Sequence, residues 1–345
     1  MSENGAAGGI SRDSMIDKVK ENKYVCTLDE ESIKTAQRDL NEIPSERESQ
    51  LEEFRRWIRS HKSWLRTPMD AVFLLSFLRM RKFSQVFARQ AIDHYWTTRT
   101  KYPDWLANID THDPAIQKVL ENGSYLTLPK RDKKGRLILL GRPGVVDTSN
   151  KHYTSDDVIK TGLALSDYFL MDELTQIHGF VVLMDFTGMT MKHMGFHGMN
   201  KMKKNAAILS RIYPIRTKEV HNYNMGSVGE TLFKITRPLL PEKVQKRIFT
   251  HSSLVSVYKE IDMSHLPEEY LPDDYTGPNA GPIDAIVENL RKEMSSPRVR
   301  DWLLTLSSGK FGIDESRRVR QKEIPQESFR MLSEADHDEV AELGL

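Results

Sequence analysis

Predicted strands and helices alternate along the second half of this 345-residue chain, and this alternation constrains its fold more than any other feature. Residues 137–140 and 179–185 are short apolar runs that suit strands buried on both faces. Further strands are expected at 219–224 and 248–251, with helices at about 155–174, 191–212 and 253–261. Such alternation is typical of a parallel or mixed sheet covered by helices. The sequence therefore predicts an α/β lobe.

Apolar residues at helical spacing precede this lobe. Leu51, Phe54 and Ile58 lie between charged residues, and a second periodic run follows Asp70, a potential N-cap. These patterns predict an N-terminal helical lobe. We expect a mobile arm at 1–27, the helical lobe at 28–110, the α/β lobe at 111–290, and a helical segment with an acidic tail at 291–345.

Residues 213–251 contain an apolar stripe at helical spacing. The stripe consists of Val228, Leu232, Ile235 and Leu239, which recur at i, i+4, i+7 and i+11. Pro238 is expected to end or kink this helix, because proline lacks a backbone donor, and Pro241 is well placed to begin a second, shorter helix. Such a helix needs an apolar partner along one face, either a protein core or a ligand.

The same stretch is locally basic. Between residues 214 and 251 there are seven Lys or Arg and three Asp or Glu, although the net charge of the whole chain is +1. A helix would project Lys243 and Arg247 from one face, and a strand would place Arg216 and Lys218 on one face. These patterns suggest a protein that meets a membrane surface and encloses an apolar molecule, although clustered Lys and Arg more often form ordinary solvated surface. An ordinary core helix followed by a solvated basic helix has the same composition.

Composition and missing motifs exclude several classes of function. Fifty basic residues against 49 acidic ones argue against bulk nucleic-acid binding. No window approaches the roughly 18 apolar residues of a membrane span, and the N-terminus lacks a signal pattern, so we expect a cytosolic protein. The single Cys26 excludes an intramolecular disulfide. Motifs for phosphate loops, dinucleotide binding and nucleophile elbows are missing, and His193 and His197 lack an evident third metal ligand. We therefore expect no cofactor, no metal and no enzymatic activity.

Five segments, in order, resemble the CRAL-TRIO family of Sec14-like lipid-binding and lipid-transfer proteins. They are L-L-S-F-L-R-M-R-K-F at 74–83, D-K-K-G-R-L-I-L-L-G-R at 132–142, V-V-L-M-D-F-T-G at 181–188, R-P-L-L-P-E-K-V-Q-K-R-I at 237–248 and L-P-D-D-Y-T-G at 271–277. The resemblance covers about residues 45–310 and favours the branch of α-tocopherol transfer and retinaldehyde-binding proteins. It implies a helical lobe packed on an α/β lobe, whose mostly parallel sheet and helical gate enclose a lipid cavity.

This resemblance also implies which residues contact the ligand. The implied cavity residues are Ser166, Phe180, Met184, Ile208, Leu209, Ile215, Val228, Leu232 and Ile235, with Ser166 offering a hydroxyl to the ligand head. We add Met191, one of six methionines between residues 184 and 202, because methionine adapts to bulky ligands. We also add Asn205, which stands where the tocopherol-binding branch has an apolar residue. Asn205 is expected either to bond a ligand oxygen or to point to solvent.

The four basic residues Arg216, Lys218, Lys243 and Arg247 match the phosphoinositide-binding groove of the same branch. The sequence is thus interpreted as a cytosolic, non-enzymatic carrier of a tocopherol-, retinoid-, carotenoid- or sterol-like ligand. It is expected to release this ligand at endosomal or other phosphoinositide-bearing membranes, with which it associates peripherally. A lipid-sensing adaptor that binds a protein partner, a phospholipid transfer protein and an enzyme of unrecognised chemistry are the alternatives.

Overall fold

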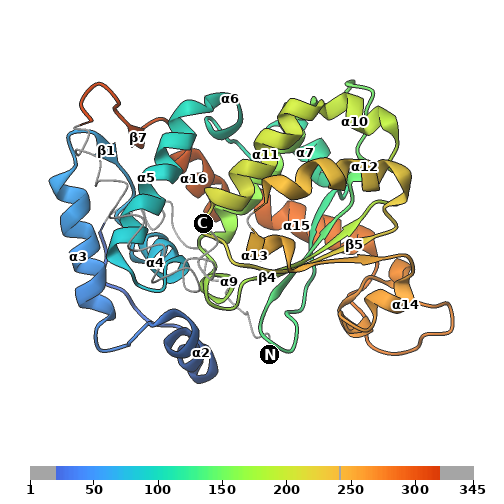
Figure 1. Cartoon of the computed structure of the whole chain (residues 1–345), viewed down its shortest axis with the longest axis horizontal. Coiled ribbons are helices and arrows are strands. Elements are labelled where there is room, and N and C mark those ends of the chain that lie inside the picture. The colour runs from blue at the N-terminus through green and yellow to red at the C-terminus, as the bar shows by residue number, and fades with distance from the viewer. Residues whose placement is uncertain (1–20, 241, 319–345) are drawn as a thin grey trace, which may run out of the picture.

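The structure, a computed structural model, describes residues 21–240 and 242–318. A helical lobe packs on an α/β lobe, so the fold class predicted from the sequence is confirmed (Figure 1). Most of the expected N-terminal arm and the acidic tail from Glu323 lie outside the described residues. The helices of the N-terminal lobe are α2 (Glu30–Leu40), α3 (Arg47–Ser60), α4 (Ala71–Met80), α5 (Gln85–Lys101) and α6 (Pro103–Leu106).

Helix α4 is the centre of the N-terminal lobe. It begins at the expected N-cap, where the Asp70 carboxylate accepts a hydrogen bond of 3.0 Å from the backbone N–H of Phe73. Phe73, Leu74, Leu75 and Phe77 are fully buried, because α4 is apolar almost all round and other helices surround it.

Five strands form the sheet of the second lobe. They are β2 (Tyr125–Thr127), β3 (Leu137–Gly141), β4 (Phe180–Asp185), β5 (Thr217–Tyr223) and β6 (Ile248–His251), and they lie in this order across the sheet. The β2–β3 pair is antiparallel and the other three pairs are parallel, as expected where helices connect the strands. Strand β5 begins two residues before the predicted start.

The helices of the second lobe are shorter than the sequence pattern predicts. The helix expected at 155–174 ends earlier, as α8 (Ser155–Phe169), and a separate helix α9 (Glu173–His178) with Asp172 as its N-cap follows it. The helix expected at 191–212 consists of α10 (Met191–His197) and α11 (Met199–Arg211). Gly198 separates this pair at φ 70°, a left-handed conformation that interrupts a helix and that glycine adopts readily.

The remaining elements complete the sheet's surroundings. They are α7 (Pro114–Glu121), η1 (Pro143–Val145), α12 (Gly226–Thr236), η2 (Arg237–Leu239), α13 (Glu242–Gln245), α14 (Leu254–Val257), η3 (Met263–His265), η4 (Glu268–Tyr270), α15 (Ile283–Ser295) and α16 (Pro297–Leu306). Helix α14 is shorter than the helix expected at 253–261. In Figure 1, α11 and α12 lie side by side over the sheet.

The C-terminal segment returns to the N-terminal lobe. Strand β7 (Gly312–Ile313) pairs antiparallel with β1 (Leu65–Arg66), and the ring of Trp302 on α16 lies 5.8 Å from that of Phe73. The boundary expected at residue 290 falls inside α15, whose buried face packs against α7 and β2. Residues of both lobes therefore share one hydrophobic core.

A buried ionic network also joins the lobes. The fully buried guanidinium of Arg79 on α4 donates to Glu42 at 2.7 Å, and on α9 to Glu173 at 2.9 Å and to Gln176 at 2.7 Å. Glu42 also accepts from Arg47 at 2.6 Å. Because each buried charge has hydrogen-bonded partners, this network fixes α4 against α9. Along the described ranges, no helix combines the length and the apolar character needed to span a bilayer.

Candidate functional site

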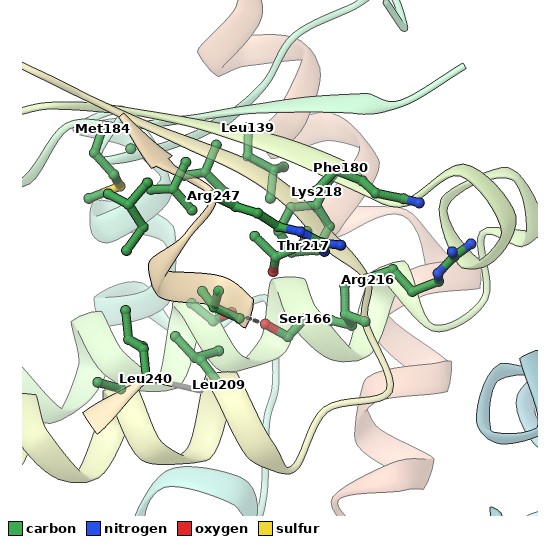
Figure 2. Close-up of a pocket in the computed structure, with 18 of the residues that line it drawn as sticks. Leu139, Ser166, Phe180, Met184, Leu209, Arg216, Thr217, Lys218, Leu240 and Arg247 are labelled. Atoms are coloured by element: carbon green, nitrogen blue, oxygen red, sulfur yellow. Dashed lines mark hydrogen bonds between the residues drawn. The ribbon is translucent and has the colours of Figure 1, made fainter. Parts of the chain in front are cut away.

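A cavity of about 870 Å³ lies between the sheet and the helices α8, α11 and α12. This volume is within the roughly 300–1,000 Å³ that is usual for small-molecule sites. Figure 2 shows that Leu139, Phe180 and Met184 reach it from the sheet, whereas Ser166 and Leu209 reach it from the opposite, helical side.

The sheet wall follows from the period-two alternation of strands. Phe180, Val182 and Met184 of β4 face the cavity, while Val181 and Leu183 point to the other face and are 1% and 0% exposed. On the neighbouring strand β3, a Cβ atom at Gly141 would lie only 2.4 Å from Sδ of Met184. Gly141 therefore makes room for the Met184 side chain.

The helical wall consists of faces of α8 and α11. On α8, Gly162, Ser166 and Phe169 recur at helical spacing toward the cavity, and the Ser166 hydroxyl donates to the Gly162 carbonyl at 3.1 Å. On α11, residues at i, i+3, i+4 and i+7 line the cavity, namely Met202, Asn205, Ala206 and Leu209. Most of this wall is apolar, so it suits a hydrophobic molecule.

Helix α12 covers the cavity, and it ends where Pro238 was expected to end it. Leu232, Phe233 and Thr236 line the cavity, followed by Leu240 after η2. Gly229 is the one fully buried residue of α12 within the described residues, and a Cβ atom there would lie 3.1 Å from the Phe186 ring. Most residues of α12 are thus partly exposed. This is expected of a helix that covers a cavity and not of a helix in the protein core.

One mouth of the cavity is basic. Arg216 and Lys218, from the start of β5, line it together with Lys243 of α13 and Arg247. Helix α13 ends at Gln245, so Arg247 follows it in the turn before β6 and does not share a helical face with Lys243 as the spacing predicted. The Arg247 guanidinium donates to the Thr217 carbonyl at 2.9 Å. In Figure 2, Arg216, Lys218 and Arg247 extend toward the end of the cavity away from Met184.

Burial and mutual repulsion perturb these cations. Burial, followed by the positive charges of Arg216, Arg247 and Lys243, lowers the pKa of Lys218 to about 8. Burial and the charge of Arg247 lower the pKa of Arg216 to about 10. Asp39 of α2 is the acidic residue that opposes both shifts. An anion bound among these residues would relieve the repulsion.

Comparisons with known proteins identify relatives of this chain. The profile "CRAL/TRIO domain" matches residues 121–270, and the profile "Pinta-like, UBA domain" matches residues 43–116. The mouse protein "Alpha-tocopherol transfer protein-like" is 33% identical over 262 residues, which are 76% of this chain and 74% of the mouse protein. The chain belongs to the CRAL/TRIO family. "Clavesin-1" from Xenopus laevis is 30% identical over 246 residues, 70% of this chain and 73% of that protein.

Members of the CRAL/TRIO family are lipid-binding and lipid-transfer proteins, and the cavity has the size and the largely apolar lining to enclose a lipid. Of the ligand residues expected from the sequence, those around the cavity are Ser166, Phe180, Met184, Asn205, Leu209, Ile215 and Leu232. The four expected basic residues also line it. The cavity therefore brings together residues from the sheet and the covering helices.

Four expected ligand residues are placed elsewhere. Met191 is the first residue of α10 and 64% exposed, and Ile208 is 3% exposed within the hydrophobic core. Val228 and Ile235 lie on α12 but outside the cavity lining. On a helix, two adjacent faces can both be apolar, and the sequence pattern does not say which of them the cavity occupies.

Sequence reasoning missed several residues around the cavity. Tyr125 comes from β2, which has three residues and is too short to show a periodic pattern. Arg38 and Asp39 of α2, with Lys82 after α4, bring the N-terminal lobe to the basic mouth. Their contribution depends on how the two lobes pack and leaves no signal in the local sequence.

Asp185, at the end of β4, and His197, which the sequence analysis considered as a metal ligand, both form hydrogen bonds within the fold. Asp185 accepts hydrogen bonds from the Tyr270 hydroxyl at 2.5 Å and the Thr187 backbone N–H at 2.9 Å. His197 contacts the Ser155 hydroxyl at 3.0 Å, and burial lowers the pKa of its imidazole to about 4. Within residues 21–240 and 242–318, no group of three or more His, Cys, Asp or Glu is arranged to hold a metal ion.

Proposed function

We propose that this chain encloses one small hydrophobic molecule of the tocopherol, retinoid, carotenoid or sterol type, and releases it at phosphoinositide-containing membranes. One observation supports both parts: the cluster of four cations borders the same cavity that the apolar residues line. A lipid bound in the cavity would lie next to a site suited to a membrane headgroup.

Phosphoinositide headgroups suit this cluster because they present several negative charges close together. Convergent cations bind a multiply charged phosphate better than a single cation does. The depressed pKa values of Arg216 and Lys218 support such a site, since partly buried cations with one nearby carboxylate gain from a bound anion. We propose a cytosolic protein that associates peripherally with endosomal or other phosphoinositide-bearing membranes.

Release follows from the position of the cluster beside the cover. Lys243 belongs to α13, which follows α12 and η2 within a few residues, and Lys218 belongs to the sheet wall. A bound headgroup that changes the distance between Lys243 and Lys218 would also move α12 and η2 relative to the cavity. Headgroup binding would therefore shift the equilibrium between a covered and an open cavity, as linkage requires.

The proposal is tested by reversing two charges, Lys243→Glu and Arg247→Glu, in one variant. We expect transfer of a fluorescent lipid to vesicles containing phosphatidylinositol bisphosphate to fall by about tenfold or more, because the local potential is inverted. Lipid binding in solution should persist. Transfer is followed by energy transfer to an acceptor lipid in the vesicles.

A matched variant, Lys203→Glu with Lys246→Glu, reverses two charges outside the cavity lining. Lys246 is paired with Glu242 at 2.8 Å and its side chain is 74% exposed. This control should retain most of the transfer rate. Equal losses in both variants would show that overall charge, and not the cavity mouth, drives transfer.

A further inference from the structure

Several polar groups of the largely apolar cavity form no hydrogen bond within the described residues, and two of them lie on its helical side. One is the side-chain oxygen Oδ1 of Asn205 on α11, which is buried and accepts no hydrogen bond within the described residues. The other is the hydroxyl of Tyr125 on β2, for which the described part of the chain provides no partner either. Buried polar groups in proteins are nearly always paired, so the buried oxygen of Asn205 requires an explanation.

Tyr125 lies beside the middle of α8. A Cβ atom at Gly162 would be 3.1 Å from Cζ and 3.2 Å from the hydroxyl oxygen of Tyr125, so the glycine lets the ring lie against the helix. Burial raises the pKa of this phenol to about 12, and it therefore remains protonated as a hydrogen-bond donor. The hydroxyl of Ser166, one turn further along α8, already donates a hydrogen bond of 3.1 Å to the Gly162 carbonyl.

Asn205 lies on the same helical side of the cavity. It is one turn before Leu209 on α11, and Figure 2 shows Leu209 on the side of Ser166, across from Leu139 and Phe180. The helical side thus presents an unpaired donor from Tyr125 and an unpaired acceptor from Asn205. The sheet wall opposite them is formed by side chains such as Leu139, Val182 and Met184.

We propose that Tyr125 and Asn205 are the polar recognition groups of the cavity and that the ligand is an amphipathic lipid with a free hydroxyl group. A hydroxyl can donate to Asn205 Oδ1 and accept from the Tyr125 hydroxyl. An aldehyde or ether offers only an acceptor and leaves the Asn205 oxygen unpaired, and a hydrocarbon leaves both groups unpaired. The inference rests on the proposed function and narrows its ligand from the wider set of hydrophobic molecules to lipid alcohols and phenols.

The test compares probes that share a carbon skeleton. Retinol competes with retinyl methyl ether, dehydroergosterol with its methyl ether, and α-tocopherol with its methyl ether, each pair at equal concentration with the full chain, and bound species are counted by native mass spectrometry. We expect at least one alcohol or phenol to be preferred over its ether by about tenfold, the size of one lost hydrogen bond in a buried site.

Two variants test the two residues separately. Asn205→Leu should reduce the preference severalfold while leaving the binding of the ether almost unchanged, because only the alcohol donates to Asn205 Oδ1. Tyr125→Phe should weaken the binding of alcohol and ether alike by severalfold, because the oxygen of either can accept from the Tyr125 hydroxyl. Thr236→Val is the matched control, because the Thr236 hydroxyl also borders the cavity but already donates to the Leu232 carbonyl at 3.0 Å. This variant should keep the preference of the unmodified chain. Thermal unfolding of each variant shows whether it is folded.

The outcomes separate this inference from the proposed function. Equal binding of alcohol and ether, a preference that survives Asn205→Leu, or binding that Tyr125→Phe leaves unchanged would overturn the proposed roles of Asn205 and Tyr125 and leave a lipid carrier in place. If none of the six probes binds and a total lipid extract also leaves the chain empty, the carrier function itself fails and the inference fails with it. A preference that Asn205→Leu abolishes, together with weaker binding of both probes in Tyr125→Phe, supports both.

Discussion

Lys218 is the residue at which the two parts of the site meet. Its carbon chain borders the lipid cavity and its ammonium group lies in the field of three other cations. A lysine whose pKa is lowered to about 8 is destabilised in its charged form by the fold. Such an unfavourable charge is expected at a position where the residue serves binding and not stability.

Replacing this lysine should therefore stabilise the protein. Below pH 8 the folded and unfolded chains both carry the proton, and the full cost of the buried charge is present. Between pH 8 and the ordinary lysine pKa of about 10.4, the unfolded chain binds more protons, so stability rises with pH. We expect Lys218→Met to raise the free energy of unfolding at pH 7 by about 1 to 3 kcal/mol and to abolish this rise.

Chemical denaturation at pH 7 and pH 10 measures both effects. Lys246→Met is the control, since Lys246 is exposed and forms an ion pair with Glu242 across one helical turn. Its replacement should change stability by less than about 0.5 kcal/mol at either pH. A Lys218→Met chain that is less stable than the unmodified one at pH 7 would show that the ammonium group has a compensating partner.

At the scale of elements, the contact between α4 and α9 determines whether the N-terminal lobe can contribute to the cavity mouth. Arg79 makes this contact, and Arg38, Asp39 and Lys82 reach the mouth from neighbouring segments of the same lobe. The buried network is thus one reason why residues from both lobes line one cavity.

We expect Arg79→Met to lower the free energy of unfolding by about 3 kcal/mol or more, because it removes one partner from a buried ionic network. The loss leaves Glu173 and Gln176 without the donor that joins them to α4. Arg89→Met serves as the comparison, since Arg89 pairs with Glu53 at 2.7 Å on a surface where the two side chains are 28% and 46% exposed. It should cost less than about 1 kcal/mol. Equal losses measured by urea unfolding would contradict a special role for the buried network.

For the whole molecule, the arrangement of the basic mouth and the cover predicts coupling between two ligands. If the proposed function holds, a headgroup at the mouth and a lipid in the cavity would contact the same strand and neighbouring helices. Each should then weaken the binding of the other, because the headgroup favours an open cavity.

A soluble inositol bisphosphate should therefore speed the release of a fluorescent lipid, without any membrane, by about fivefold or more. Release is measured by stopped-flow mixing with excess unlabelled lipid. Unphosphorylated inositol should have no effect, and the Lys243→Glu, Arg247→Glu chain should lose the acceleration. An unchanged release rate would show that the mouth binds membranes without acting on the cover.

The sequence by itself predicted the features that depend on local patterns. Unbroken apolar runs indicated the β3 and β4 strands, helical spacing indicated the helical lobe, and Pro238 indicated where α12 ends. Each of these features depends on residues close together in the chain. The motifs from 74 to 277 also identified the family correctly. The sequence pattern predicted a single helix at 191–212, because the left-handed conformation of Gly198 leaves no trace in the spacing of apolar residues.

Only the tertiary structure decided which side chains meet. Met191, Ile208, Val228 and Ile235 have the right chemistry for a lipid cavity, but the rotation and tilt of their helices turn them elsewhere. Tyr125 comes from a three-residue strand, and the unpaired oxygen of Asn205 is recognisable only when all its neighbours are placed. Apolar spacing specifies that a helix has a buried face, whereas packing against distant segments determines what that face contacts.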